Sequence, residues 1–229
     1  DSPEYAAVEA QIAAVFEDLR LFEKRNLSEF ALQQIGIYFS GTDNPFLAVP
    51  YFEELLARTN PEADPFKGPA EMELGKIEMR SPEAAKVQSA RERFRRIIDK
   101  YKDKDLIPDA YLNLADLHIK AKEWKDALTA LDVINKQKDF FGKQREKRAE
   151  AGFKMGLVLD ELGEPASANQ AYLSVVSTYA AFYDWVTQAW ERYIPNSLAD
   201  MEKMEANDPL SIALKRERQL TLYKLCQKY

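Results

Sequence analysis

The sequence predicts an all-α protein, a right-handed α-solenoid of antiparallel helix pairs with a capping helix at each end. Small residues recur on apolar helical patterns at separations of 39, 40 and 41 residues, at Gly36, Gly75, Ala115 and Gly156. Apolar residues at helical spacing follow each of them, so every unit is expected to hold two amphipathic helices. A repeat of this length is typical of a stacked helical protein. We expect a single domain over residues 1–229.

The first predicted element is an N-terminal cap over residues 4–28. Its helix carries apolar side chains on one face, at Val8, Ile12, Val15, Phe16 and Leu19. A stacked repeat needs such a cap because its end units would otherwise expose an apolar face.

Four repeats follow, at residues 29–62, 68–102, 108–141 and 149–182. The second helix of each repeat carries an alanine, a large apolar residue four positions on and an aliphatic residue three positions further. These sets are Ala48, Phe52 and Leu55; Ala90, Phe94 and Ile97; Ala127, Leu131 and Ile134; and Ala168, Tyr172 and Val175. Pro45, Pro82 and Pro165 mark the turns within three pairs. The third pair turns without glycine, at Lys122-Glu123-Trp124.

Residues 183–229 are aromatic-rich, match the repeat poorly and are predicted to form a C-terminal helical cap. The expected order is a helix through Trp185 and Trp190, an interruption near Pro195, a short segment to Met204 and a last helix from about Pro209. The interruption is expected because proline lacks the N–H group that a helix interior uses.

The spacing between the two helices of a pair resembles the tetratricopeptide repeat. Twelve residues separate the small residue from the alanine in the first, third and fourth units. The clearest copy is PDAYLNLADLHIKAKEWKDALTALDVI, which matches the packing positions of that motif at Tyr111, Leu114, Ala115, His118, Ala127, Leu131 and Ile134. The second unit departs from the motif, because Glu71 and Glu78 stand at packing positions. The period of about 40 residues also exceeds the 34 of the family.

Two further phrases, FRRIIDKYKDKDLIPDAYLNLADL and YLSVVSTYAAF, resemble the long-helix tetratricopeptide proteins of the bacterial cell envelope. These include the outer-membrane assembly lipoprotein and the periplasmic coordinators of envelope constriction. The resemblance implies a periplasmic or envelope-associated location, with the cytoplasm as the alternative. The chain begins at Asp1 rather than Met, which is compatible with a leader or a lipid anchor before Asp1. Its apolar runs fall short of the ~18 residues that a membrane span needs.

The charge distribution weighs against nucleic acid as the main partner. The net charge is −6, and a nucleic-acid-binding domain usually carries a basic excess. The basic helix predicted over residues 86–104 supports one alternative function, a nucleic-acid-associated helical scaffold. Acidic residues dilute this helix, so a solvent-exposed repeat helix is the preferred interpretation.

The sequence indicates no enzyme. His118 is the one histidine and sits at a packing position, and the one cysteine, Cys226, has no histidine nearby in the sequence to act as its base. Glycine-rich phosphate loops and the motifs of common hydrolases are absent from the sequence. We therefore expect no catalytic residue, no cofactor and no metal site.

The family resemblance implies that the first helix of each pair lines a concave groove. The matching residues are Phe30, Gln33, Ile37, Met72, Lys76, Met79, Arg80, Asp109, Leu112, Asp116, Lys120, Phe153, Leu157, Asp160 and Glu161. Relatives that bind chaperone tails use a clamp of lysines and asparagines here, and only Asn113 fits that clamp. The mixed groove favours an extended peptide or a partner's helix. Trp185 and Trp190 are predicted to form a second binding surface, a C-terminal aromatic face.

The sequence therefore predicts a non-catalytic scaffold of the tetratricopeptide type that binds a protein or peptide partner. The partner's identity and the oligomeric state are left open at this stage.

Overall fold

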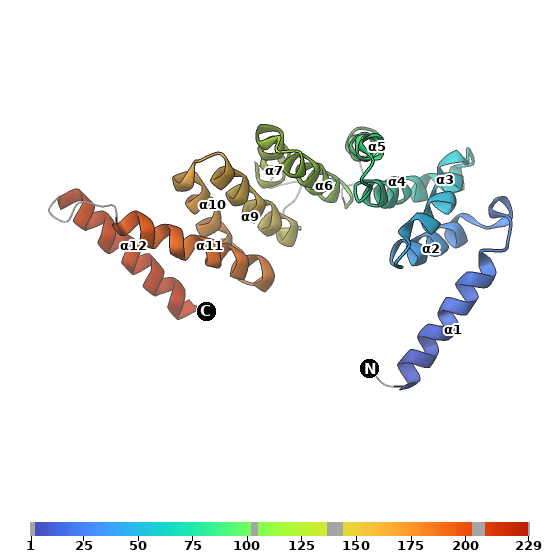
Figure 1. Cartoon of the computed structure of the whole chain (residues 1–229), viewed down its shortest axis with the longest axis horizontal. Coiled ribbons are helices and arrows are strands. Elements are labelled where there is room, and N and C mark those ends of the chain that lie inside the picture. Colours follow the sequence, from blue (N-terminus) through green and yellow to red (C-terminus); the bar gives the residue numbers. More distant parts are fainter. Residues whose placement is uncertain (1–2, 102–104, 137–143, 203–208, 229) are drawn as a thin grey trace. The chain divides into compact units, whose positions relative to one another are not determined.

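The computed structural model describes residues 3–101, 105–136, 144–202 and 209–228, which are almost entirely helical (Figure 1). No strand occurs within these ranges. Contacts divide the chain into two compact units, Asp1–Asn113 and Leu114–Tyr229, and the division falls within helix α6 (Ile107–Lys120). The predicted all-α class is confirmed, whereas the single domain over 1–229 stays a prediction.

The first unit contains the N-terminal helix and two helix pairs. Its α-helices are α1 (Pro3–Leu19), α2 (Glu29–Ser40), α3 (Val49–Ala57), α4 (Asp64–Glu78) and α5 (Ala84–Arg96). Short 3-10 turns connect them at Lys24–Asn26, Pro45–Ala48 and Pro61–Ala63, and a π-helical turn, Ile97–Tyr101, follows α5. The pairs α2/α3 and α4/α5 coincide with the first two predicted repeats.

The second unit begins within α6 and continues with four helices and a C-terminal helix. These are α7 (Trp124–Lys136), α9 (Arg145–Glu161), α10 (Pro165–Thr178), α11 (Tyr183–Glu202) and α12 (Pro209–Lys228). The pairs α6/α7 and α9/α10 coincide with the third and fourth predicted repeats. The core of this unit is built around Tyr172, Val175 and Val176 of α10, and α11 packs on it through Ala189 and Tyr193.

Close helix crossing explains the recurring small residues. A Cβ atom added to Gly36 or Gly75 would lie 2.6 or 2.7 Å from the ring of Phe52 or Phe94. At Gly156 the same atom would lie 2.2 Å from the Tyr172 ring. Each glycine therefore lets an aromatic side chain of the second helix pack directly on the backbone of the first.

The predicted interruption at Pro195 is wrong, because α11 continues through it to Glu202. Proline removes one backbone hydrogen bond from a helix interior. Burial of Val186 and Tyr193 before it and Met201 after it offsets that loss, since all three fall on the packed side of α11. The predicted short segment to Met204 ends among residues outside the described ranges.

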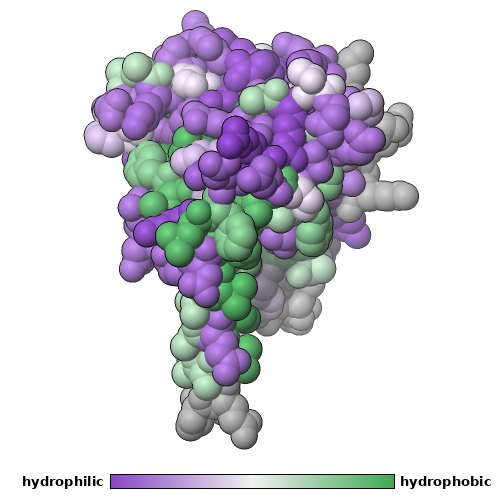
Figure 2. Space-filling model, turned by 90° about the vertical axis from the view of Figure 1, so that its right-hand side faces the viewer, coloured by the Kyte–Doolittle hydropathy of each residue, from purple (hydrophilic) through white to green (hydrophobic). Residues whose placement is uncertain are grey.

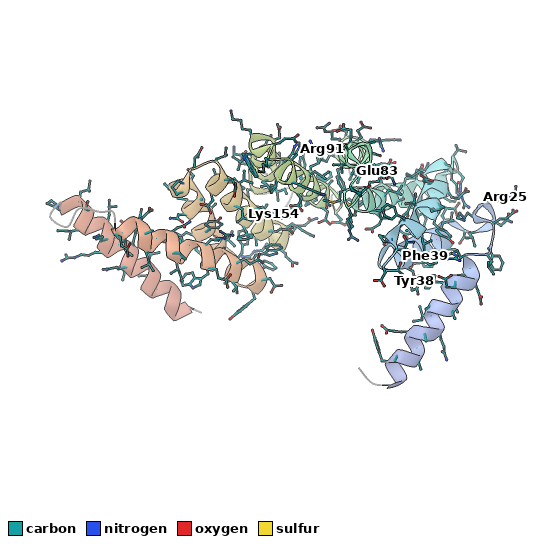
Figure 3. All side chains as sticks on the ribbon, viewed as in Figure 1. Arg25, Tyr38, Phe39, Glu83, Arg91 and Lys154 are labelled. Atoms are coloured by element: carbon teal, nitrogen blue, oxygen red, sulfur yellow. The ribbon has the colours of Figure 1, made fainter. Side chains whose placement is uncertain are left out.

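Helix α1 is present as predicted, and its last turn packs on the rest of the first unit. The Phe16 ring stacks on Tyr38 of α2, with ring centroids 4.1 Å apart and an interplanar angle of 9°, and Figure 3 labels Tyr38 beside the end of α1. Leu19 also contacts the core of the first unit. Val8 and Val15, expected on the buried face, are exposed instead, and Figure 2 shows hydrophobic residues along α1.

Candidate functional site

A cleft of about 430 Å³ in the second unit brings together four residues predicted for the groove. These are Lys120 at the end of α6 and Leu157, Asp160 and Glu161 of α9. The remaining lining residues are Ile119, Lys122, Trp124, Val158 and Arg192. The groove predicted from the first helices is therefore completed here by the α6–α7 turn and by α11.

The turn between α6 and α7 positions the aromatic side of this cleft. Lys122 has a φ of 60°, a left-handed conformation that usually requires glycine. The Glu123 N–H donates to the His118 carbonyl at 2.8 Å, and the Lys122 N–H donates to the Ile119 carbonyl at 3.0 Å. These two bonds end α6 and start α7 directly at Trp124. The predicted tight turn without glycine is confirmed.

Asp160 is held in place from the core side. The Tyr172 hydroxyl donates a hydrogen bond of 2.7 Å to its carboxylate. Burial, followed by the hydrogen bond to Asp160 and its charge, raises the pKa of Tyr172 well above its ordinary value. The phenol therefore stays protonated and keeps the Asp160 carboxylate oriented on α9.

The cleft offers cations, carboxylates and apolar surface side by side. Lys120, Lys122 and Arg192 supply positive charge, and Asp160 and Glu161 supply negative charge. Ile119 and Leu157 provide apolar contacts next to the indole of Trp124. This composition fits a peptide segment with apolar anchors and charged side chains between them.

The other groove residues of the second unit have structural partners. Lys154, labelled in Figure 3, places its ammonium nitrogen 2.6 Å from the carboxylate of Asp116. Phe153 is buried between Tyr172 and Trp185, with ring centroids 6.0 Å from each. Neither Asp116 nor Phe153 lines the cleft.

The groove residues of the first unit divide into buried and exposed sets. Met72 and Leu112 are buried, whereas Phe30, Ile37 and Arg80 are exposed. Gln33, Lys76, Met79 and Asp109 are half-buried. The ammonium of Lys76 pairs with Glu73 at 2.8 Å. Asn113, the one match to the chaperone clamp, donates to the Asp109 carbonyl at 2.8 Å.

The predicted aromatic face of α11 is partly inside the protein. Trp185 packs on Phe153, and Trp190 lies 6.4 Å from the ring of Tyr193. Both tryptophans are half-buried against the core of the second unit. Only their outer edges are left for a partner.

The glutamates that depart from the repeat motif form a partly buried ion-pair cluster with α5. The guanidinium of Arg93 lies 2.7 Å from the carboxylate of Glu71 and 2.9 Å from that of Glu78. Arg96 adds a contact of 3.0 Å to Glu71. Burial lowers the pKa of Arg93, but the hydrogen bonds and charges of both glutamates outweigh it and raise that pKa overall.

This cluster weakens the nucleic-acid alternative. Within the basic helix predicted over 86–104, Arg93 and Arg96 pair with Glu71, whereas Arg95 is exposed. Residues 102–104 lie outside the described ranges. A phosphate would have to compete with carboxylates already in place.

His118 is buried on α6, as its packing position predicted. It also contacts an acidic side chain, which the sequence did not suggest. Its Nδ1 lies 2.6 Å from Glu123, and His118, Glu123 and Asp126 offer ligand atoms within 4.8 Å of one another. The Glu123 contact links the end of α6 to the turn before α7. The side chain of Cys226 lies outside the described part.

A second cleft, of about 330 Å³, lies between α10, α11 and α12 and was not predicted. Asn169 lines it, and its side-chain oxygen is buried without a hydrogen-bond partner. Asp200 and Arg218 pair at 3.0 Å on the same wall. No pattern in the sequence pointed to Asn169, because its position depends on how α12 returns toward α10.

None of the helices in the described ranges combines the length and the hydrophobicity that a membrane span requires.

The paired helices define a helical-hairpin repeat architecture. The family profile for the tetratricopeptide repeat matches residues 109–137 and 150–181, which coincide with α6/α7 and α9/α10. These two segments therefore match the tetratricopeptide repeat, as the sequence resemblance indicated. A comparison with curated proteins gives no match.

The fold is also similar to that in the crystal structure of MamA protein. The two chains share 20% identity, with a TM-score of 0.53 and coverage of 87% of this chain and 91% of that one. At this identity the similarity shows the fold alone.

Proposed function

We propose that this protein is a non-catalytic scaffold that binds an extended peptide segment of a protein partner in the cleft lined by α6, α7, α9 and α11. The observation that carries the proposal is the meeting of predicted groove residues, Lys120 and Asp160 among them, with Trp124 and Arg192 in one cleft. Tetratricopeptide repeats are in general protein-binding scaffolds, which supports this class.

The cleft selects its partner by charge position and apolar contact. Trp124 and Leu157 desolvate an apolar side chain of the peptide, and such aromatic anchors carry most of the energy in many interfaces. Lys120 and Arg192 attract acidic residues, while Glu161 attracts basic ones. Because both signs occur, the partner is a sequence-specific segment rather than a uniformly charged one.

Capture of partners from a lysate of the source organism tests this proposal. The bait is the 229-residue chain, with Trp124→Ala and Arg192→Glu as cleft variants and Arg95→Glu on α5 as an exposed control. We expect the cleft variants to lose a protein that the wild type and the control retain. The captured protein's affinity, measured by titration calorimetry, falls at least about tenfold in each cleft variant, as for loss of one interface anchor. Equal retention by all four baits would reject the cleft.

We also propose that the protein acts in a bacterial cell envelope. The support is the resemblance of FRRIIDKYKDKDLIPDAYLNLADL and YLSVVSTYAAF to envelope members of the family. Fractionation of cells that express the native gene tests this location. Release of the protein with periplasmic or membrane material is the expected result, and recovery with cytoplasmic markers alone would contradict it.

A further inference from the structure

Exposed apolar side chains concentrate on the first and the last helix of the sequence. Of the fifteen large hydrophobic side chains exposed among the described residues, eight belong to these two helices, and Leu21 and Phe22 follow α1 directly. Four are Tyr5, Val8, Ile12 and Val15 of α1, and four are Leu210, Ile212, Leu214 and Leu220 of α12. Clusters of exposed apolar residues mark interaction surfaces more often than single ones do.

Helix α1 carries its apolar residues at the spacing of a coiled-coil seam. Tyr5, Val8, Ile12, Val15 and Leu19, named here the α1 seam, alternate at intervals of three and four residues. This is the 3.5-residue period with which one helix packs along another. Val8, Ile12 and Val15 are 53%, 45% and 57% exposed, so most of the seam faces solvent (Figure 2).

The charges beside the seam indicate what packs on it. Helix α1 has four acidic residues and no basic one, and Glu9 and Asp18 are exposed. Two copies of α1 would bring carboxylates together, which opposes pairing of α1 with itself. The seam therefore fits a helix that has both apolar and basic side chains.

Helix α12 of the same chain has this composition. It carries five basic residues and one acidic residue. Arg216 and Lys224 are exposed, as are Leu210, Leu214 and Leu220. These five residues are named here the α12 surface.

We propose that this protein associates head to tail, with the α1 seam of one copy packing on the α12 surface of another copy. The contact is heterologous, because different surfaces of the two copies meet. The pair then keeps an unused seam on one copy and an unused α12 surface on the other, so further copies add in the same way. The proposal does not depend on the peptide cleft.

Sedimentation velocity of the 229-residue chain over a concentration series tests the association. The mean mass is expected to rise with concentration beyond that of a dimer. The seam variant Val8→Ser/Ile12→Ser and the α12 variant Arg216→Glu/Lys224→Glu each weaken association at least about tenfold. The variant Arg95→Glu, changed at an exposed site on α5, keeps the wild-type behaviour. Circular dichroism checks that all variants retain wild-type helicity.

Mixing the two weakened variants distinguishes this arrangement from others. The seam variant keeps an intact α12 surface, and the α12 variant keeps an intact seam, so one contact forms between them. We expect a heterodimer that does not grow further at higher concentration. A wild-type chain that stays monomeric at every concentration would overturn the proposal. Association that survives the α12 substitutions would do so too, since it would indicate pairing of α1 with itself.

Discussion

At the scale of single residues, Glu71 shows how a charged side chain can replace an apolar one at a packing position. Its side chain is 6% exposed and contacts both Arg93 and Arg96 of α5. Replacing Glu71 by Ala leaves the half-buried guanidinium of Arg93 with Glu78 alone. Because Glu71 accepts charge-assisted hydrogen bonds from Arg93 and Arg96, we expect a loss of about 1.5–3 kcal/mol in the free energy of unfolding.

Urea denaturation measures this loss, and a second ion pair serves as the control. Glu73 pairs with Lys76 at 2.8 Å in a more exposed position, so Glu73→Ala should cost less than about 1 kcal/mol. Equal, small effects of the two substitutions would show that the Glu71 cluster adds no more than a surface pair does.

Glu29 gives the first unit a dependence on pH. A hydrogen bond from the Asn60 side chain, a backbone hydrogen bond and the Arg58 guanidinium together lower the pKa of Glu29 from 4.5 to about 2. A carboxylate with a lowered pKa in the folded state stabilises the fold above its unfolded pKa. This stabilisation is lost as the pH falls from 4.5 towards 2.

The variant Glu29→Gln tests this dependence. It should be less stable than the wild type at neutral pH, and its thermal midpoint should fall less between pH 4.5 and 2. Melting curves at a series of pH values provide the comparison. Curves that run parallel for the two proteins would mean that Glu29 is not the titrating group.

At the scale of helices, the aromatic–glycine crossing is the recurring contact of the repeats. An alanine at position 75 would place its Cβ 2.7 Å from the Phe94 ring. We expect Gly75→Ala to lower the free energy of unfolding by about 1–3 kcal/mol, the usual cost of overpacking a core. The same substitution in a Phe94→Leu background should cost less than about 1 kcal/mol, because the smaller side chain leaves room for the methyl group. Urea denaturation of the four proteins gives the coupling, and additive losses would contradict the crossing.

The turn between α6 and α7 provides a second test at this scale. Lys122 and Gly163 end equivalent helices with φ values of 60° and 76°. Lys122→Gly should stabilise the chain by about 0.5 kcal/mol, because glycine avoids most of the left-handed backbone strain but loses more entropy on folding. Gly163→Ala should destabilise it by about 1 kcal/mol. Thermal melts that rank the two changes in the opposite order would show that these turns are not equivalent.

The sequence predicted the positions of the helices better than it predicted how the helices pack. The i, i+4, i+7 pattern predicted the second helices correctly because local periodicity and buried face coincide there. Two features depended on distant residues instead. A proline in this position predicts a helix break from local sequence alone. Helix α11 nevertheless continues through Pro195, because buried residues on both sides of it pack on the second unit. The apolar face of α1 has the pattern of a buried cap, yet Val8 and Val15 are exposed, while its last turn packs on the core.

At the scale of the molecule, the candidate cleft was predictable in part. Lys120, Leu157, Asp160 and Glu161 were assigned from their positions in the repeat, and they do meet. Arg192 was not, because it lies beyond the last repeat and reaches the cleft only through the packing of α11 on the fourth pair. Asp116 was assigned by the same rule as Lys120, but Lys154 of the next pair occupies its carboxylate. Repeat position predicts which helix face a residue occupies, whereas its neighbours decide whether it is open to a partner.

The division into two compact units predicts that a substitution that destabilises one repeat increases local unfolding in its own unit and not in the other. Stacked repeats are stabilised by contacts within a repeat and with its neighbours. In Gly156→Ala the added Cβ would lie 2.2 Å from the Tyr172 ring, so α9 and α10 should separate more often and their amides should exchange faster with deuterium. Hydrogen exchange followed by mass spectrometry should show this acceleration in α9, α10 and α11, with exchange in α2 and α3 unchanged. Gly75→Ala should accelerate exchange in α4 and α5 instead and leave exchange in α9 and α10 unchanged. If either substitution accelerates exchange equally in both units, the chain unfolds as one cooperative body, which is the behaviour of the single domain predicted over residues 1–229.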